Sequence, residues 1–270
     1  MKLISAVLAS FCGVATAQAD TLYDTFPYPL IEVTGAEALQ EWQALRPQAG
    51  TPIILGDREQ VERILDFFHP SQQPFYQPIE QAIAKAKTQP GLDLLYEHLR
   101  EEHRLFIASV KEDDADWAAE LAAENPLEVP ADYWGPWPEG MQSADRLISL
   151  DDWQTGRPKD KVFITILPTE AAWQAPIYLR FGGWNANPPP YVHAAAFRHW
   201  GETYGAVPVV IQSDTVEMLV ADPASDRDAA RGLATQQYLY ANDIVDQGVG
   251  DLSALAVLLH KGGFWYFWWD

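Results

Sequence analysis

In the first half of the chain, apolar residues are spaced as in α-helices in some segments and as in β-strands in others. Pro52 to Leu55 is an uninterrupted apolar run of the kind found in buried parallel strands. Asp57, with Gln60 three residues later, forms a capping box that starts the next helix. The predicted elements are, in order, a strand at 28–33, a helix at 35–45, a strand at 52–55, and helices at 57–68, 75–87, 92–110 and 111–124. The chain therefore opens as β-α-β-α and continues as helices.

The second half alternates more regularly. The predicted strands are 162–167, 176–181, 207–211, 216–220 and 264–269, and the predicted helices are 188–204, 226–240 and 252–260. The last strand carries aromatic residues at successive positions, which favours burial on both faces and a central place in the sheet. We expect an α/β or α+β protein, in which a mixed β-sheet with packed helices forms the C-terminal domain and a smaller β-α-β-α and helical region precedes it.

The beginning of the chain resembles a secretory leader. Lys2 precedes a short apolar stretch, and Ala17-Gln18-Ala19 has the small-x-small pattern of a signal-peptidase site. We therefore expect a signal peptide at 1–19, cleavage before Asp20, and a periplasmic or secreted protein. The expected divisions of the mature chain are an acidic N-terminal region at 20–150 and a C-terminal domain at 151–270. Residues 125–161 between the regular elements are rich in Pro, Gly and Trp, and should pack as a linker.

Composition narrows the possible functions. Among 270 residues, 38 are acidic and 18 basic, giving a net charge of -20, so binding to nucleic acid is not expected. No segment beyond the leader is apolar over the length of a membrane span. The single cysteine, Cys12, lies in the leader, which leaves no internal disulfide or cysteine zinc site. We expect neither a metal nor a cofactor, and a partner that is a protein or a small molecule. The eleven tryptophans are the most unusual feature.

Several long strings in residues 160–270 resemble a known family. They include Tyr178 to Asn185, Pro188-Pro189-Pro190, His193, Asp243 to Gly248 and the closing Trp265 to Asp270. This region is similar to the bacterial domain of unknown function 4253 family, and the resemblance implies no activity. The chain departs from the family pattern at Asn187 and at Ala241-Asn242, where the resemblance implies cysteines. Their absence is consistent with an exported member.

Three residues could carry acid–base chemistry. His193 lies early in the helix predicted at 188–204, and histidine is the usual proton shuttle near neutral pH. Asp243 and Asp246 flank two apolar residues in a predicted loop. They could form a carboxylate pair for acid–base chemistry or a weak metal site, or Asp246 could serve with Asp251 as helix N-caps. The alternative for His193 is a buried packing residue. If it lies beside one of the carboxylates, its pKa should be raised.

Five further residues could line a binding site. Trp184 and Asn185 follow two glycines at the end of a predicted strand, and Gln247 lies beside Asp246. Trp268 and Asp270 end the aromatic strand. Aromatic walls with a few polar groups are typical of ligand pockets. We expect a Trp-lined cleft in a binding module for a ligand or protein; the alternative is a non-covalent hydrolase or lyase that uses His193 with Asp243 or Asp246.

Overall fold

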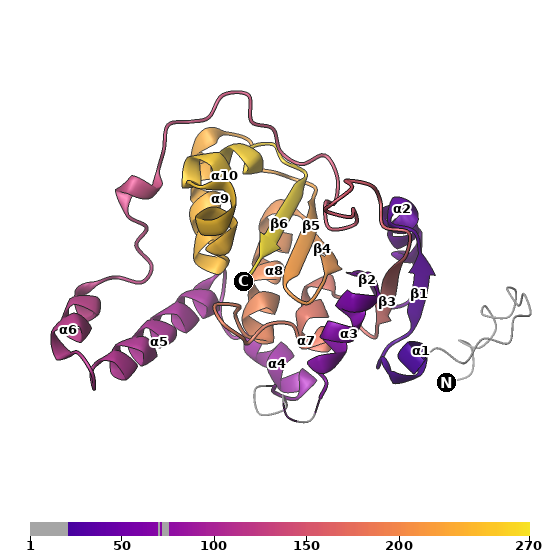
Figure 1. Ribbon diagram of the computed structural model, residues 1–270, viewed down its shortest axis with the longest axis horizontal. Coiled ribbons are helices and arrows are strands. Elements are labelled where there is room, and N and C mark those ends of the chain that lie inside the picture. The colour runs from indigo at the N-terminus through magenta and orange to yellow at the C-terminus, as the bar shows by residue number, and fades with distance from the viewer. Residues whose placement is uncertain (1–20, 70, 72–75) are drawn as a thin grey trace, which may run out of the picture.

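One mixed β-sheet organises the protein (Figure 1). The computed structural model describes residues 21–69, 71 and 76–270; the predicted leader and its cleavage site lie outside this part of the chain. The described strands are β1 (Leu30–Val33), β2 (Thr51–Gly56), β3 (Val162–Leu167), β4 (Ala206–Ile211), β5 (Thr215–Val220) and β6 (Phe264–Trp268). Their order in the sheet is β1-β3-β2-β4-β5-β6. The expected mixed α/β fold is confirmed.

The sheet takes strands from both sides of residue 150. β3 pairs with β1 and with β2, antiparallel in both cases, so it lies between two strands that precede it by more than a hundred residues. β2 and β4 form the parallel pair through Ile54 and Val210. β4, β5 and β6 then continue as antiparallel neighbours. A division at residue 150 therefore does not separate two sheets.

Helices cover the sheet on both faces. The helices are α1 (Thr21–Thr25), α2 (Gly35–Leu45), α3 (Arg58–Asp66), α4 (Ile79–Ala86), α5 (Asp93–Val110), α6 (Ala115–Ala123), α7 (Ala175–Leu179), α8 (Pro190–Tyr204), α9 (Arg227–Tyr240) and α10 (Leu252–Leu259), with short 3-10 helices η2 (Ala131–Tyr133) and η3 (Ala172–Gln174). In β2, Ile53 and Leu55 belong to the large core that includes α8 and α9, whereas Ile54 belongs to the core under α2. The apolar run of β2 is thus buried on both faces, as predicted.

Acidic and hydroxyl side chains begin the helices as expected. Their oxygens accept a hydrogen bond from the backbone N–H three residues on in five helices, at Thr34, Asp57, Asp114, Asp226 and Asp251. The capping box at Asp57 is only half formed. Gln60 turns away from the helix start, and its Oε1 accepts hydrogen bonds from the backbone N–H and the hydroxyl of Ser213. The side chain therefore ties α3 to the β4–β5 turn.

Two sequence predictions of local structure are wrong. The strand predicted at 176–181 is not formed: Ala175–Leu179 is helix α7, because Pro176 fits the first turn of a helix and Arg180 ends it in a left-handed conformation. Residues 244–249 form a π-helix, η4 (Ile244–Val249), and not a loop. Of the two N-caps considered there, Asp251 is confirmed, whereas Asp246 lies inside the π-helix.

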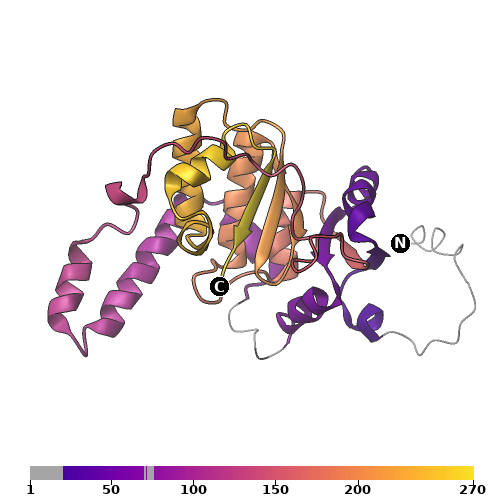
Figure 2. The same cartoon turned by 45° about the horizontal axis from the view of Figure 1, so that its top comes forward.

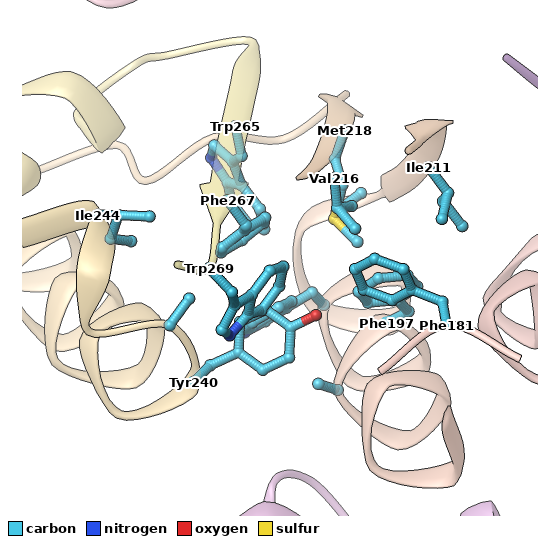
Figure 3. Packing of buried hydrophobic residues seen from close by; sticks show 14 of the residues in the cluster. Phe181, Phe197, Ile211, Val216, Met218, Tyr240, Ile244, Trp265, Phe267 and Trp269 are labelled. Atoms are coloured by element: carbon cyan, nitrogen blue, oxygen red, sulfur yellow. The ribbon is translucent and has the colours of Figure 1, made fainter. Parts of the chain in front are cut away.

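β6 is also misplaced by the sequence prediction. It is the last strand of the sheet in the described part of the chain, and not a central one. Trp265 and Phe267 are buried, and Trp269, just beyond the strand, packs with them among aromatic side chains of α8 and α9 (Figure 3). Phe264 and Trp268 are only half-buried, and Tyr266 is 38% exposed. The aromatic pattern therefore reflects one deeply buried face and one partly covered face.

The segment between α4 and β3 extends beyond the sheet and its covering helices, although parts of it pack against them. α5 and α6 form an arm that projects from the sheet and its helices in both views (Figures 1 and 2). The linker at 125–161 packs as expected, with Tyr133, Trp134 and Trp137 half-buried against the core. Among the described residues, no helix has the length and apolar character needed to cross a bilayer.

Candidate functional site

An apolar groove runs beside the outer edge of the sheet. It has a volume of about 290 Å³ and lies between β6 on one side and η4 and α10 on the other. Phe264, Tyr266 and Trp268 line it from the strand, and Leu255 and Leu259 line it from α10. Two of the residues selected from the sequence, Asp243 and Trp268, belong to this groove. We call it the β6 groove.

The backbone of β6 faces this groove with unpaired groups. Gly263 accepts a hydrogen bond from Val220 N–H, and Trp269 donates one to Asp214 C=O, so both ends of the strand bond to β5. In an antiparallel pair these bonds alternate along the strand. The N–H and C=O groups of residues 264, 266 and 268 therefore point away from β5. In the described part of the chain, these three donors and three acceptors have no strand partner.

Gln237 is the most unusual polar residue in the groove. It lies on α9, only 1% exposed, and lines the β6 groove. Neither its amide nitrogen nor its amide oxygen has a hydrogen-bond partner in the described structure. Trp265 Nε1, also buried and also lining the groove, has no partner either. Buried polar groups of this kind are normally paired, so a donor and an acceptor of a ligand would complete the site.

Four of the predicted site residues are joined by hydrogen bonds. Gln247 Nε2 donates to Asp243 Oδ1 at 3.0 Å. Asp270 N–H donates to Asp243 Oδ2 at 2.9 Å, and Asn185 Nδ2 donates to Asp270 C=O at 2.9 Å. Asp243 is 9% exposed, and both of its oxygens are engaged. This network holds η4 and the residues after β6 in fixed positions at one end of the groove.

His193 lies apart from this network. Its side chain is fully buried and both ring nitrogens are hydrogen-bonded, Nδ1 with Tyr240 Oη at 2.5 Å and Nε2 with Asn187 Oδ1 at 2.7 Å. Asn187 Oδ1 can only accept, so Nε2 carries the proton and Nδ1 accepts from Tyr240. In the described structure, no hydrogen bond or ion pair joins His193 to Asp243 or Asp246.

Burial, and not a carboxylate neighbour, sets the pKa of His193. Burial disfavours the charged imidazolium and lowers the pKa well below 6.5, and the charge of His98 adds to this effect. The raised pKa was expected only if a carboxylate lay beside His193, and the described structure places Tyr240 and Asn187 there instead. His193 is thus a neutral residue of the aromatic core, packed against Phe181 and Trp269.

The remaining predicted residues lie at the surface. Asp246 is exposed and accepts hydrogen bonds from Asn242 Nδ2 at 3.0 Å and from Tyr238 Oη at 3.5 Å. Trp184 is half-buried, and its Nε1 has no partner in the described structure. Within the same described residues, no group of three His, Cys, Asp or Glu side chains is arranged to hold a metal ion.

Sequence reasoning missed Gln237 and the open edge of β6. A signal for Gln237 was present, because it follows Leu233 and Ala234 at helical spacing and therefore lies on the apolar face of its helix. The edge position of β6 had no such signal, since it depends on where strands from the other half of the chain insert.

Comparison with known proteins supports the resemblance seen in the sequence. Residues 163–270 match the model of a family described as a domain of unknown function (DUF4253). No curated protein and no solved structure matches the chain. The matched region includes the β6 groove residues from α9 onward and begins inside β3.

Proposed function

We propose that this protein is a binding module that takes an extended apolar peptide segment of a partner protein in the β6 groove. The observation that carries the proposal is the pairing of an open strand edge with a buried, unpartnered amide. An extended peptide adds to a sheet edge through its own backbone groups, which match those of residues 264, 266 and 268.

The Gln237 amide fits the same ligand. A primary amide offers one acceptor oxygen and a donor NH₂ group, which complement the N–H and C=O of a peptide unit. Trp265 Nε1–H provides a further donor toward a carbonyl oxygen. These groups would be satisfied by a backbone, whatever the sequence of the peptide.

The apolar walls of the β6 groove determine which peptide side chains can bind. Leu255, Leu259 and Phe264 make the groove predominantly apolar, so alternate side chains of the bound strand should be aliphatic. Asp243 lies at one end with both oxygens engaged, and its charge disfavours an acidic residue there. Neutral segments rich in Val, Ile and Leu are therefore the expected partners.

Amide hydrogen exchange measured by NMR tests the proposal. In the free protein, the N–H groups of Phe264, Tyr266 and Trp268 should exchange faster than those of Trp265 and Phe267, which bond to β5. Addition of acetyl-Val-Ile-Val-amide should slow the first group at least tenfold and leave the second unchanged. Slowing of both groups alike, or of neither, would contradict strand addition.

Single N-methylation of the peptide provides a matched control. Only alternate N–H groups of an added strand face β6, so methylation at one position should weaken binding at least tenfold and methylation at the next should not. A series without this alternation would indicate a small-molecule or purely hydrophobic mode of binding in place of strand pairing.

A further inference from the structure

Arg180 adopts an unusual backbone conformation. It follows the last residue of α7 with φ 54° and ψ 33°, in the left-handed region. Residues with a side chain rarely occupy this region, and their presence there is often linked to function. The conformation directs the chain out of α7 and places the arginine beside α4 and the residues that follow α3.

The guanidinium of Arg180 lies among aromatic rings, and no acidic side chain of the described residues forms an ion pair with it. Its centre is 4.8 Å from the centroid of the Phe68 ring and 5.5 Å from that of Tyr76. Nη1 is buried and has no hydrogen-bond partner, and no carboxylate of the described residues forms an ion pair with it. Among the described residues, five other arginines form ion pairs with carboxylates, whereas Arg46, Arg227 and Arg231 lie over tryptophan rings much as Arg180 lies over Phe68. Arg180 differs from these three in lining a cavity with a buried, unpartnered nitrogen.

A small cavity lies against this guanidinium. Its volume is about 220 Å³, and Tyr28, Tyr178 and Tyr191 form much of its wall, with Ile79 and Ile177 adding apolar surface. Tyr28 Oη donates a hydrogen bond to Tyr178 C=O at 3.0 Å. Burial raises the pKa of Tyr28 to about 12, so the phenol stays neutral and does not serve as the missing anion.

Arg180 and this cavity together have the features of an anion site. Arg180 is half-buried as a residue, and its buried Nη1 without a hydrogen-bond partner is unfavourable. Guanidinium groups bind carboxylate and phosphate through two parallel hydrogen bonds. The aromatic walls would hold a flat apolar body. The site is separate from the β6 groove, with which it shares no lining residue.

We propose that the Arg180 cavity binds a small aromatic or other flat apolar molecule that bears one oxyanion, which pairs with the guanidinium. Carboxylates and phosphates share this chemistry. Arg180 supplies the charge and the two-pronged geometry, and the tyrosines supply the apolar contact.

Titration calorimetry with three probes of the same ring tests the proposal. The probes are benzoate, phenyl phosphate and uncharged benzyl alcohol. At least one of the two anions should bind, and benzyl alcohol should bind at least tenfold more weakly. The preference between the anions then identifies the source of the oxyanion. Absence of binding by both anions, or equal binding of benzyl alcohol, would overturn the proposal.

Three variants assign the binding to the guanidinium. Arg180→Asn, with a residue that tolerates the left-handed region, and Arg180→Lys, which keeps one charge, should each weaken anion binding at least tenfold. The control is Arg46→Gln, because Arg46 also lies over a ring, that of Trp42 at 4.9 Å, but is exposed. It should leave binding unchanged.

Thermal unfolding separates a ligand role from a structural one. An arginine kept for an anion is not needed by the folded protein, so Arg180→Asn should have a Tm equal to or above that of the wild type. A Tm lowered by several degrees in both Arg180 variants would show that the ring contacts stabilise the fold, and would overturn the proposal. Anion binding that persists in Arg180→Lys at full strength would do the same.

Discussion

Two neighbouring glutamines on α9 should have opposite effects when each is replaced by leucine. Gln237 has two buried amide atoms without partners, whereas Gln236 Oε1 accepts a hydrogen bond from Trp200 Nε1 at 3.1 Å. Leaving a buried polar group unpaired costs about 1–3 kcal/mol. Gln237→Leu removes such groups and should raise the free energy of unfolding by about 1–3 kcal/mol. Gln236→Leu creates one on Trp200 and should lower it by about the same amount.

Urea unfolding measures both effects. Each variant should keep the slope of the wild type, so that the shift in midpoint reports stability alone. Gln237→Leu should also lose binding of the apolar peptide, because the amide that complements its backbone is gone. If Gln237→Leu is instead destabilised by more than about 1 kcal/mol, the amide is satisfied in solution and the groove has no free polar group to offer.

Three other measurements test the structure. Trp269→Ala, at 1% exposure, should cost about 3–5 kcal/mol of stability, and Trp268→Ala, half-buried at the sheet edge, clearly less; equal losses would contradict the edge position of β6. Burial lowers the pKa of His193, so the stability contributed by the neutral ring is complete above pH 6.5 and is lost as the pH falls below that value. His193→Gln should therefore reduce the slope of the unfolding free energy against pH by up to about 1.4 kcal/mol per pH unit. An unchanged slope would be inconsistent with the burial of His193. N-terminal sequencing of the native protein should find a mature start at Asp20, and a chain that begins at Met1 would exclude the cleavage.

Local structure was largely predictable from the sequence. The helix 35–45 has the bounds that the pattern indicated, and Asp57 and Asp226 begin their helices through hydrogen bonds that depend only on nearby residues. The strand predicted at 176–181 failed because β-branched and aromatic residues are also common in short buried helices, and α7 is positioned by its contacts with α8. Local propensity does not determine such a segment.

The site was predictable only in part. Asp243, Gln247, Asn185 and Asp270 were selected as polar residues in unusual strings, and the structure brings these four into one network. His193 was grouped with them for its chemistry and for its place early in the following helix, but it lies among aromatic rings that disfavour a charge. The open edge that defines the groove arises from pairing over long sequence separations, which periodicity does not report.

The position of β3 affects how the chain can fold during its synthesis. β1 and β2 do not pair with each other, and each pairs with β3 at residues 162–167. Both strands therefore leave the ribosome well before their partner β3 has been synthesised. Contacts over such distances form slowly, and unpaired strands are exposed meanwhile to aggregation. The same order means that a fragment of residues 163–270 would leave β4 without β2 and expose a second edge. The smallest unit that folds without aggregating should therefore include β1 and β2, and fragments designed from the family boundary alone should be poorly soluble.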